Sequence, residues 1–185
     1  MTKRINWKKY FGIRQHYYYR VDKTRPFAFP NAELHVKTVT KENYKDIQKR
    51  YPKRVPLFYS FLENGNKGFY GYINGRLVAY GWAILNKQNR SKKVRGFFPL
   101  PGNAACIHFC RVMDDFQGKK IYQTMLAYMY KELYQEVNDI YLDTEITNQA
   151  ANQAVNKSNG EIVGRLIRFV FLGRTLLTFK QINKW

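Results

Sequence analysis

The chain has 185 residues, of which 45% are hydrophobic, so it can bury the core of one domain, with or without a small extension. Its 32 Lys and Arg against 13 Asp and Glu give a net charge of +19, which indicates either a solvated basic surface or an anionic partner such as nucleic acid, an acidic membrane or small phosphorylated ligands. No apolar run reaches the roughly 18 residues of a transmembrane helix, and the basic N-terminus lacks the apolar core of a signal peptide, so we expect a cytoplasmic protein.

The first 32 residues are predicted to form a basic N-terminal extension, 1–32, that precedes a domain over 33–185. Within the extension, Tyr17–Val21 is predicted to be an edge strand. Pro26 and Pro30 then favour an extended connection into the domain.

The domain begins with a strand pattern followed by two helix patterns. Residues 33–40 alternate apolar and polar side chains, which is typical of a half-buried strand. Thr40 is predicted to cap a helix that ends near Arg50. Residues 57–62 are predicted to form a second, shorter helix.

The strongest local signal is Asn74-Gly75, which lies between the apolar runs 69–73 and 77–85. Asn-Gly favours the type I′ turn of a β-hairpin because both central residues of that turn need positive φ. Residues 86–98, which follow the hairpin, are predicted to be a long basic loop, and loops of this length are often functional.

The rest of the chain alternates strand and helix patterns without repeats or low-complexity tracts. The predicted elements are a strand over 104–112, a helix over 118–136, a strand over 139–145, a helix over 148–157, and a final pair of strands over 161–171 and 174–182. From residue 33 onward the order is β-α-α-β-β-β-α-β-α-β-β. It predicts an α/β fold in which one mixed sheet carries helices on both faces.

The loop before the longest helix has the features of an anion site. Ile121, Met125 and Met129 recur every fourth residue, which is the apolar stripe of an amphipathic helix. Gly118 precedes the helix, and Lys119 and Lys120 flank its start. The unpaired N–H groups and the dipole of a helix N-terminus both favour a phosphate there.

This loop resembles the acyl-coenzyme A loop of the GCN5-related N-acetyltransferases (GNAT), whose pattern Q/R-x-x-G-x-G/A corresponds here to Gln117–Tyr122. Lys120 and Tyr122 stand where that family has its two later signature residues, so the match is incomplete. A second segment resembles the family's strand-to-helix pattern N-x-x-A, with Val155 where a general-acid tyrosine is frequent. Its matching residues are Asn148, Ala151, Ala154, Lys157 and Gly160. Together with the element order, these segments imply a twisted, mostly antiparallel acetyltransferase sheet from about residue 33 onward.

The resemblance implies transfer of an acetyl group from acetyl-CoA to a primary amine. It implies that Cys110, Arg111 and Val112 offer a strand edge to the pantetheine, and that the Val112 N–H stabilises the oxyanion. It also implies that Asn148 contacts the pantetheine region, although this residue taken alone is better explained as a plain helix cap. The diphosphate would be held by Gln117, Gly118, Lys119, Lys120, Ile121 and Tyr122.

The amine must lose a proton, and we expect His108 or Glu145 to accept it, with Asp143 as a further candidate. Cys106 and Cys110 flank His108 in C-x-H-x-C spacing. In a strand all three would share one face, with the outer two about 13 Å apart. That separation excludes a tetrahedral metal site and a disulfide, so we expect free thiols and no metal.

The acceptor is predicted to be a small amine, and an anionic one suits the net charge. The segments YYYRVD, QGKKIYQ and IYLDT resemble acetyltransferases of surface-polysaccharide pathways, which act on amino sugars. The alternatives are a tRNA-directed acetyltransferase, a basic nucleic-acid-binding module, and a non-catalytic acyl-CoA-binding relative. A homodimer is compatible with each of them.

Overall fold

The computed structural model describes residues 11–172 and 174–182, and its centre is one eight-stranded sheet. The strand order is β10-β9-β1-β8-β7-β4-β3-β2. Among the described residues, every neighbouring pair in this sheet is antiparallel except β7 and β8, which are parallel. The strands are β1 (Phe11–Val21), β2 (His35–Val39), β3 (Lys67–Ile73), β4 (Arg76–Asn86), β7 (Ala104–Val112), β8 (Asp139–Glu145), β9 (Gly160–Phe171) and β10 (Arg174–Ile182).

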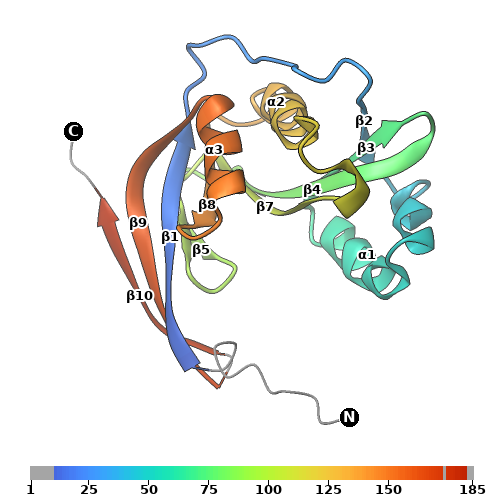
Figure 1. Cartoon of the computed structure of the whole chain (residues 1–185). Coiled ribbons are helices and arrows are strands. Elements are labelled where there is room, and N and C mark those ends of the chain that lie inside the picture. The colour runs from blue at the N-terminus through green and yellow to red at the C-terminus, as the bar shows by residue number, and fades with distance from the viewer. Residues whose placement is uncertain (1–10, 173, 183–185) are drawn as a thin grey trace.

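Helices cover both faces of the sheet, which confirms the predicted mixed α/β fold. Figure 1 shows α2 and α3 on one face, and α1 with the hairpin that contains β5 on the other. The helices are α1 (Val55–Glu63), α2 (Ile121–Leu133) and α3 (Gln149–Lys157), and the hairpin pairs β5 (Lys92–Val94) with β6 (Phe98–Leu100). No helix in the described part of the chain is long and apolar enough to cross a membrane.

Local sequence signals explain the centre of the fold. Asn74 and Gly75 have φ angles of 49° and 73°, as the predicted turn between β3 and β4 requires. The predicted apolar stripe of α2 is confirmed, because Ile121, Met125 and Met129 are all buried against the sheet. Burial of this stripe fixes the direction in which the N-terminus of α2 points.

The predicted helix over residues 40–50 is wrong in type: only a 3-10 helix, Tyr44–Lys49, forms there. Ile47 is its one buried residue, so the segment lacks the apolar stripe that stabilises a longer α-helix. Thr40 and Asn43 also bind each other locally, since the Asn43 side chain accepts from the Thr40 N–H at 2.8 Å. The 86–98 segment is not a bare loop either. It contains β5 and the start of β6, and the Asn86 side chain donates to Arg90 and Pro101 carbonyls at 3.0 and 2.7 Å.

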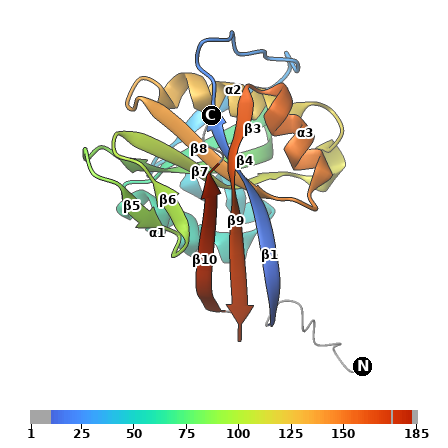
Figure 2. The ribbon, with the colours of Figure 1, turned by 90° about the vertical axis from the view of Figure 1, so that its left-hand side faces the viewer.

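The prediction of an edge strand at Tyr17–Val21 is wrong. The strand begins earlier, at Phe11, and lies inside the sheet, where it pairs with β8 on one side and β9 on the other. Figure 2 shows β1, β9 and β10 as three long strands side by side. Residues 1–10 lie outside the described residues, and the division into 1–32 and 33–185 stays a prediction.

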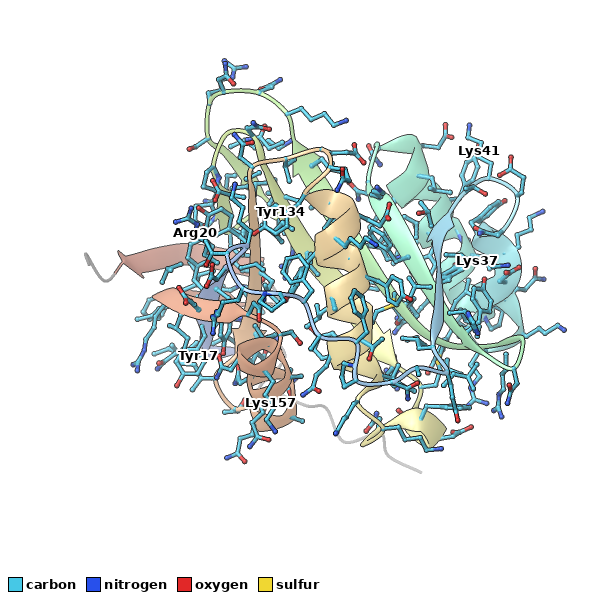
Figure 3. The ribbon with its side chains drawn as sticks, turned by 90° about the horizontal axis from the view of Figure 1, so that it is seen from above. Tyr17, Arg20, Lys37, Lys41, Tyr134 and Lys157 are labelled. Carbon is cyan, nitrogen blue, oxygen red and sulfur yellow. The ribbon has the colours of Figure 1, made fainter. Side chains whose placement is uncertain are left out.

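Residues 22–34 connect β1 to β2 by crossing over α2, as Figure 3 shows from above. The Asn31 N–H donates to the Thr124 hydroxyl at 2.9 Å, and the Asn31 amide donates to the Lys119 carbonyl at 3.0 Å. At the other end, the Tyr134 hydroxyl donates to the Val21 carbonyl at 2.8 Å. The crossing segment therefore holds the start of α2 and the loop before it in place.

Candidate active site

A cleft opens where the two parallel strands separate. β7 and β8 pair from Ala104 opposite Asp139 as far as Ile107 opposite Leu142. Beyond that point β7 continues along β4, whereas β8 continues along β1. The space between them is a cleft of about 1070 Å³ that is lined by residues from both faces of the sheet.

A β-bulge in β7 shapes one wall of this cleft. Tyr80 lies opposite Arg111 and Trp82 opposite His108, so the two residues Phe109 and Cys110 face the single residue Gly81. Phe109 has a φ of 55°, which is uncommon for a residue with a side chain and is typical of a bulge.

The bulge overturns the prediction that Cys106, His108 and Cys110 share one face. A Cβ on Gly81 would lie 2.9 Å from Cys110 Sγ, on the side of the sheet that α2 covers. His108 stays on the opposite side, with its ring 5.2 Å from that of Phe61. Both cysteines are free, and the described residues contain no group of three His, Cys, Asp or Glu that could hold a metal ion.

Past the bulge, β7 offers a backbone donor to the cleft. The Met113 N–H donates to the Val78 carbonyl at 2.8 Å. Because successive N–H groups of an antiparallel strand point in opposite directions, the Val112 N–H points away from β4. On that side β7 no longer pairs with β8, whose pairing with it ends at Ile107 and Leu142. The Val112 N–H therefore faces the cleft.

The loop before α2 closes the other end of the cleft. Gly118 and Lys120 have φ angles of 77° and 58°, and Lys120 is the N-cap of α2 without any side-chain cap hydrogen bond. The first N–H groups of a helix have no partner inside it, and the residues that carry them, 121–123, line the cleft. A Cβ on Gly118 would meet nothing within 4 Å, so the loop borders open space. These features fit an anion such as a diphosphate.

The structure brings nearly all of the sequence-predicted site residues to this cleft. Lys119 is the exception, and its ammonium group lies 5.1 Å from the centre of the Phe116 ring instead. Asn148 lines the cleft and is also the cap of α3, since its side chain accepts from the Ala151 N–H at 3.2 Å. The predicted residues that line the cleft are His108, Cys110, Arg111, Val112, Gln117, Gly118, Lys120, Ile121, Tyr122, Glu145 and Asn148.

The two predicted proton acceptors have different environments. Burial, and to a smaller extent the charge of Arg95, lowers the pKa of the His108 imidazole to about 4. The Glu145 side chain is 47% exposed and lies 3.5 Å from Arg14.

Sequence reasoning missed His16 and Arg95, and it ranked Asp143 below His108 and Glu145. His16 Nδ1 lies 2.8 Å from one Asp143 oxygen, and Arg95 Nη1 lies 2.5 Å from the other. Burial alone would raise the pKa of the Asp143 carboxyl, but the contacts with His16 and Arg95 outweigh burial and hold this pKa below its usual value. No local pattern could have found the cluster, because His16, Arg95 and Asp143 come from three separate segments.

Comparison with known proteins identifies a family pattern. Residues 7–164 match the model of the acetyltransferase (GNAT) family. No curated protein matches the sequence.

Solved structures resemble the chain in fold at low sequence identity. A GNAT-family acetyltransferase from Colwellia psychrerythraea has a TM-score of 0.66 at 15% identity, over 86% of this chain and 57% of its own. A protein of unknown function from Staphylococcus epidermidis ATCC 12228 has a TM-score of 0.60 at 12% identity, over 93% and 68%. The aminoglycoside N-acetyltransferase AAC(6')-Iy, solved with a bisubstrate analogue, has a TM-score of 0.54 at 12% identity, over 71% and 93%. The chain thus spans little more than half the length of the Colwellia protein.

Proposed function

The chain belongs to the GNAT acetyltransferase family, and from this premise we propose that it transfers an acetyl group from acetyl-CoA to a primary amine. The observation that carries the proposal is the cleft between β7 and β8. One end of this cleft has an uncapped helix N-terminus, and its wall has an unpaired strand edge. Acetyl-CoA would use both: its diphosphate would bind the helix N-terminus, and its pantetheine arm, which carries the thioester, would bind the strand edge.

The anion end of the cleft supports binding of the donor. The N–H groups at the start of α2 and the ammonium of Lys120 would hold the diphosphate. The β7 edge from Cys110 to Val112 would pair with the pantetheine amides in the manner of an added strand. Gly118 leaves the approach to the helix open.

The strand edge also supports the chemistry. The amine nitrogen attacks the thioester carbonyl, a C–N bond forms, and the C–S bond breaks with its electron pair going to sulfur. In this proposal the Val112 N–H would donate to the carbonyl oxygen as negative charge develops there, and one such donor is worth about 3 kcal/mol. His108 and Glu145, the residues that the sequence singles out as proton acceptors, both line the same cleft.

For the acceptor we propose a small amine of the amino-sugar type, and an anionic one suits the net charge of +19. A fold shared with AAC(6')-Iy, which was solved with a CoA–aminoglycoside analogue, supports this class of acceptor.

The test combines donor binding with acceptor turnover. Thermal unfolding is measured with acetyl-CoA, CoA and longer acyl-CoAs, and a ligand at 100 times its dissociation constant stabilises by about 2.7 kcal/mol. Acetyl-CoA consumption is then followed with glucosamine, a nucleotide-linked amino sugar, spermidine, a peptide N-terminus and aminoacyl-tRNA. Absence of any stabilisation refutes the proposal. Donor binding without turnover of any amine would instead indicate a non-catalytic relative, and selective turnover of aminoacyl-tRNA would replace the amino sugar by tRNA.

A further inference from the structure

A buried ionic cluster borders the cleft on the sheet face opposite α3. His16 comes from β1, Asp143 from β8, and Arg95 from the turn between β5 and β6. The His16 and Asp143 side chains are only 7% and 2% exposed. Burying an ionised carboxylate is costly unless it is paired, and clusters of this kind concentrate at functional sites.

The register of the sheet sets the contact between the histidine and the carboxylate. His16 lies directly opposite Glu145, so Asp143, two residues earlier on β8, is its diagonal neighbour on the same face. The Nδ1 atom of His16 faces the Asp143 oxygen at 2.8 Å. Both ring nitrogens are buried, and neither makes a hydrogen bond among the described residues; Nδ1 is the one close to Asp143, and Nε2 lies on the other side of the ring.

A buried polar atom without a partner needs an explanation, and a substrate group is one. His16 lines the same cleft as Val112 and the loop before α2. An imidazole whose one nitrogen faces a carboxylate presents the lone pair of its other nitrogen. The Nε2 atom is therefore arranged to accept a proton from a group inside the cleft.

We propose that His16 is the general base of the acetyl transfer, with Asp143 as the residue that orients its ring and Arg95 as the residue that holds the other Asp143 oxygen. This inference rests on the proposed function. The acceptor amine arrives as an ammonium ion, its N–H bond breaks, and the proton moves to His16 Nε2. The freed electron pair on nitrogen forms the new C–N bond, the C–S bond breaks with its electron pair going to sulfur, and the second proton lost by the nitrogen passes to the departing thiolate, which leaves as the thiol. The negative charge of Asp143 stabilises the imidazolium that results.

The two proton acceptors that the sequence singles out are less suitable. With a pKa near 4, His108 would return a proton to the amine instead of retaining it. The Glu145 side chain is partly exposed and already contacts the Arg14 guanidinium. Among the described residues, neither side chain makes a direct hydrogen bond or ion pair with a carboxylate.

Several charged groups surround His16 and shape any pH dependence. They are Asp143 and Glu145 from β8, Arg95 from the β5–β6 turn, His108 from β7, Arg168 from β9 and Arg14 from β1. Arg168 lies over the Phe97 ring at 3.8 Å, and Phe97 in turn lies 5.8 Å from the His16 ring. Burial alone would raise the pKa of Asp143, but its contacts with His16 and Arg95 hold this pKa below its usual value.

The test compares the full-length chain with His16→Gln, using acetyl-CoA and the amine that the wild-type acetylates fastest. We expect kcat to fall by about 10²- to 10⁴-fold near pH 7, while the dissociation constant for acetyl-CoA changes less than threefold. The loss should shrink at high pH, where the amine deprotonates without a base. His35→Gln, the same change at an exposed position on β2, should leave kcat unchanged.

A second variant protects the test against misfolding. Asp143→Asn should lower kcat less than His16→Gln and move the acid limb of the kcat profile to lower pH, because an uncharged neighbour holds a proton on His16 less tightly. If His16→Gln keeps kcat within threefold, or loses activity equally at every pH, the inference is overturned while the proposed function stands. If the wild-type neither binds acetyl-CoA nor acetylates any amine, the proposed function fails and the inference fails with it.

Discussion

Lys120 occupies a backbone conformation that suits glycine, and replacing it should have opposite effects on folding and on donor binding. Its φ of 58° and ψ of 13° lie in the left-handed region at the N-cap of α2. A side chain in this region costs roughly 1–2 kcal/mol. Lys120→Gly removes that cost and also removes a positive charge from the edge of the cleft.

The size of the stability effect follows from two opposing terms. Relief of the left-handed conformation contributes about 1–2 kcal/mol, and the greater freedom of glycine in the unfolded chain subtracts about 0.4–1 kcal/mol. We therefore expect the free energy of unfolding to rise by roughly 0.5–1 kcal/mol. For a chain of this length such a change raises Tm by about 1–4 °C.

The effect on acetyl-CoA should have the opposite sign. A lysine about 4 Å from a phosphate contributes about 1 kcal/mol in a water-like environment, so the dissociation constant should rise about fivefold. The difference should shrink at high salt, because exposed charges are screened. Differential scanning calorimetry and isothermal titration calorimetry measure the two effects on the same samples.

Lys119→Gly is the matched control. It introduces the same residue and removes the same charge one position earlier, but Lys119 has no positive φ and does not line the cleft. This control should lose about 0.5–1 kcal/mol of stability and bind acetyl-CoA nearly as the wild-type does. If Lys120→Gly and Lys119→Gly change Tm equally, or if only Lys119→Gly weakens binding, the assignment of the loop is wrong.

Three further changes test other parts of the structure. Gly118→Trp should weaken acetyl-CoA binding at least 100-fold in calorimetric titration, because the indole would fill open space in the cleft. Gly118→Ala, at the same φ of 77°, should bind acetyl-CoA within tenfold of the wild-type. Equal binding by both variants would refute the site. Gly68→Ala should cost about 1–3 kcal/mol in urea unfolding, since its Cβ would lie 2.7 Å from Trp82 ring carbons, and an unchanged midpoint would contradict this packing. Because the folded pKa of Asp143 is lowered, the contribution of this carboxylate to the free energy of unfolding is fully present above pH about 4 and is lost as pH falls through the folded pKa. The urea midpoint of Asp143→Asn should therefore depend less on pH between about 2 and 5 than that of the wild-type. Parallel curves for the two proteins would show that Asp143 does not titrate in this way.

Features that depend on neighbours in the sequence could be predicted from it. The β3–β4 turn follows from Asn74-Gly75, and β8 has the predicted bounds, Asp139–Glu145. Residues 117–122 also lie where their position before the apolar stripe predicts, in the loop before α2 and in its first turn, although their role in donor binding stays a prediction. In each case the signal and the structure that it produces lie within about a dozen residues of each other.

Features that depend on distant segments could not be predicted. The position of β1 between β8 and β9 arises from pairings across more than a hundred residues, such as His16 with Glu145. The bulge at Phe109 escaped detection because the C-x-H-x-C spacing fits a regular strand, and only the pairing with Gly81 shows an extra residue. Because of this extra residue, the side chains of Cys110 and His108 lie on opposite faces of the sheet.

The same distinction explains why a linear motif locates only half of the candidate site. The donor end needs backbone N–H groups in sequence, and one loop supplies them. The proposed proton transfer uses an imidazole, a carboxylate and a cation in contact, and in this structure they come from three separate segments, at His16, Arg95 and Asp143. β1 supplies the imidazole only because it pairs with β8 and so places His16 beside Asp143. The sequence predicted the Tyr17–Val21 segment of β1 as an edge strand, but the proposed acid–base chemistry depends on the pairing of β1 with β8 inside the sheet.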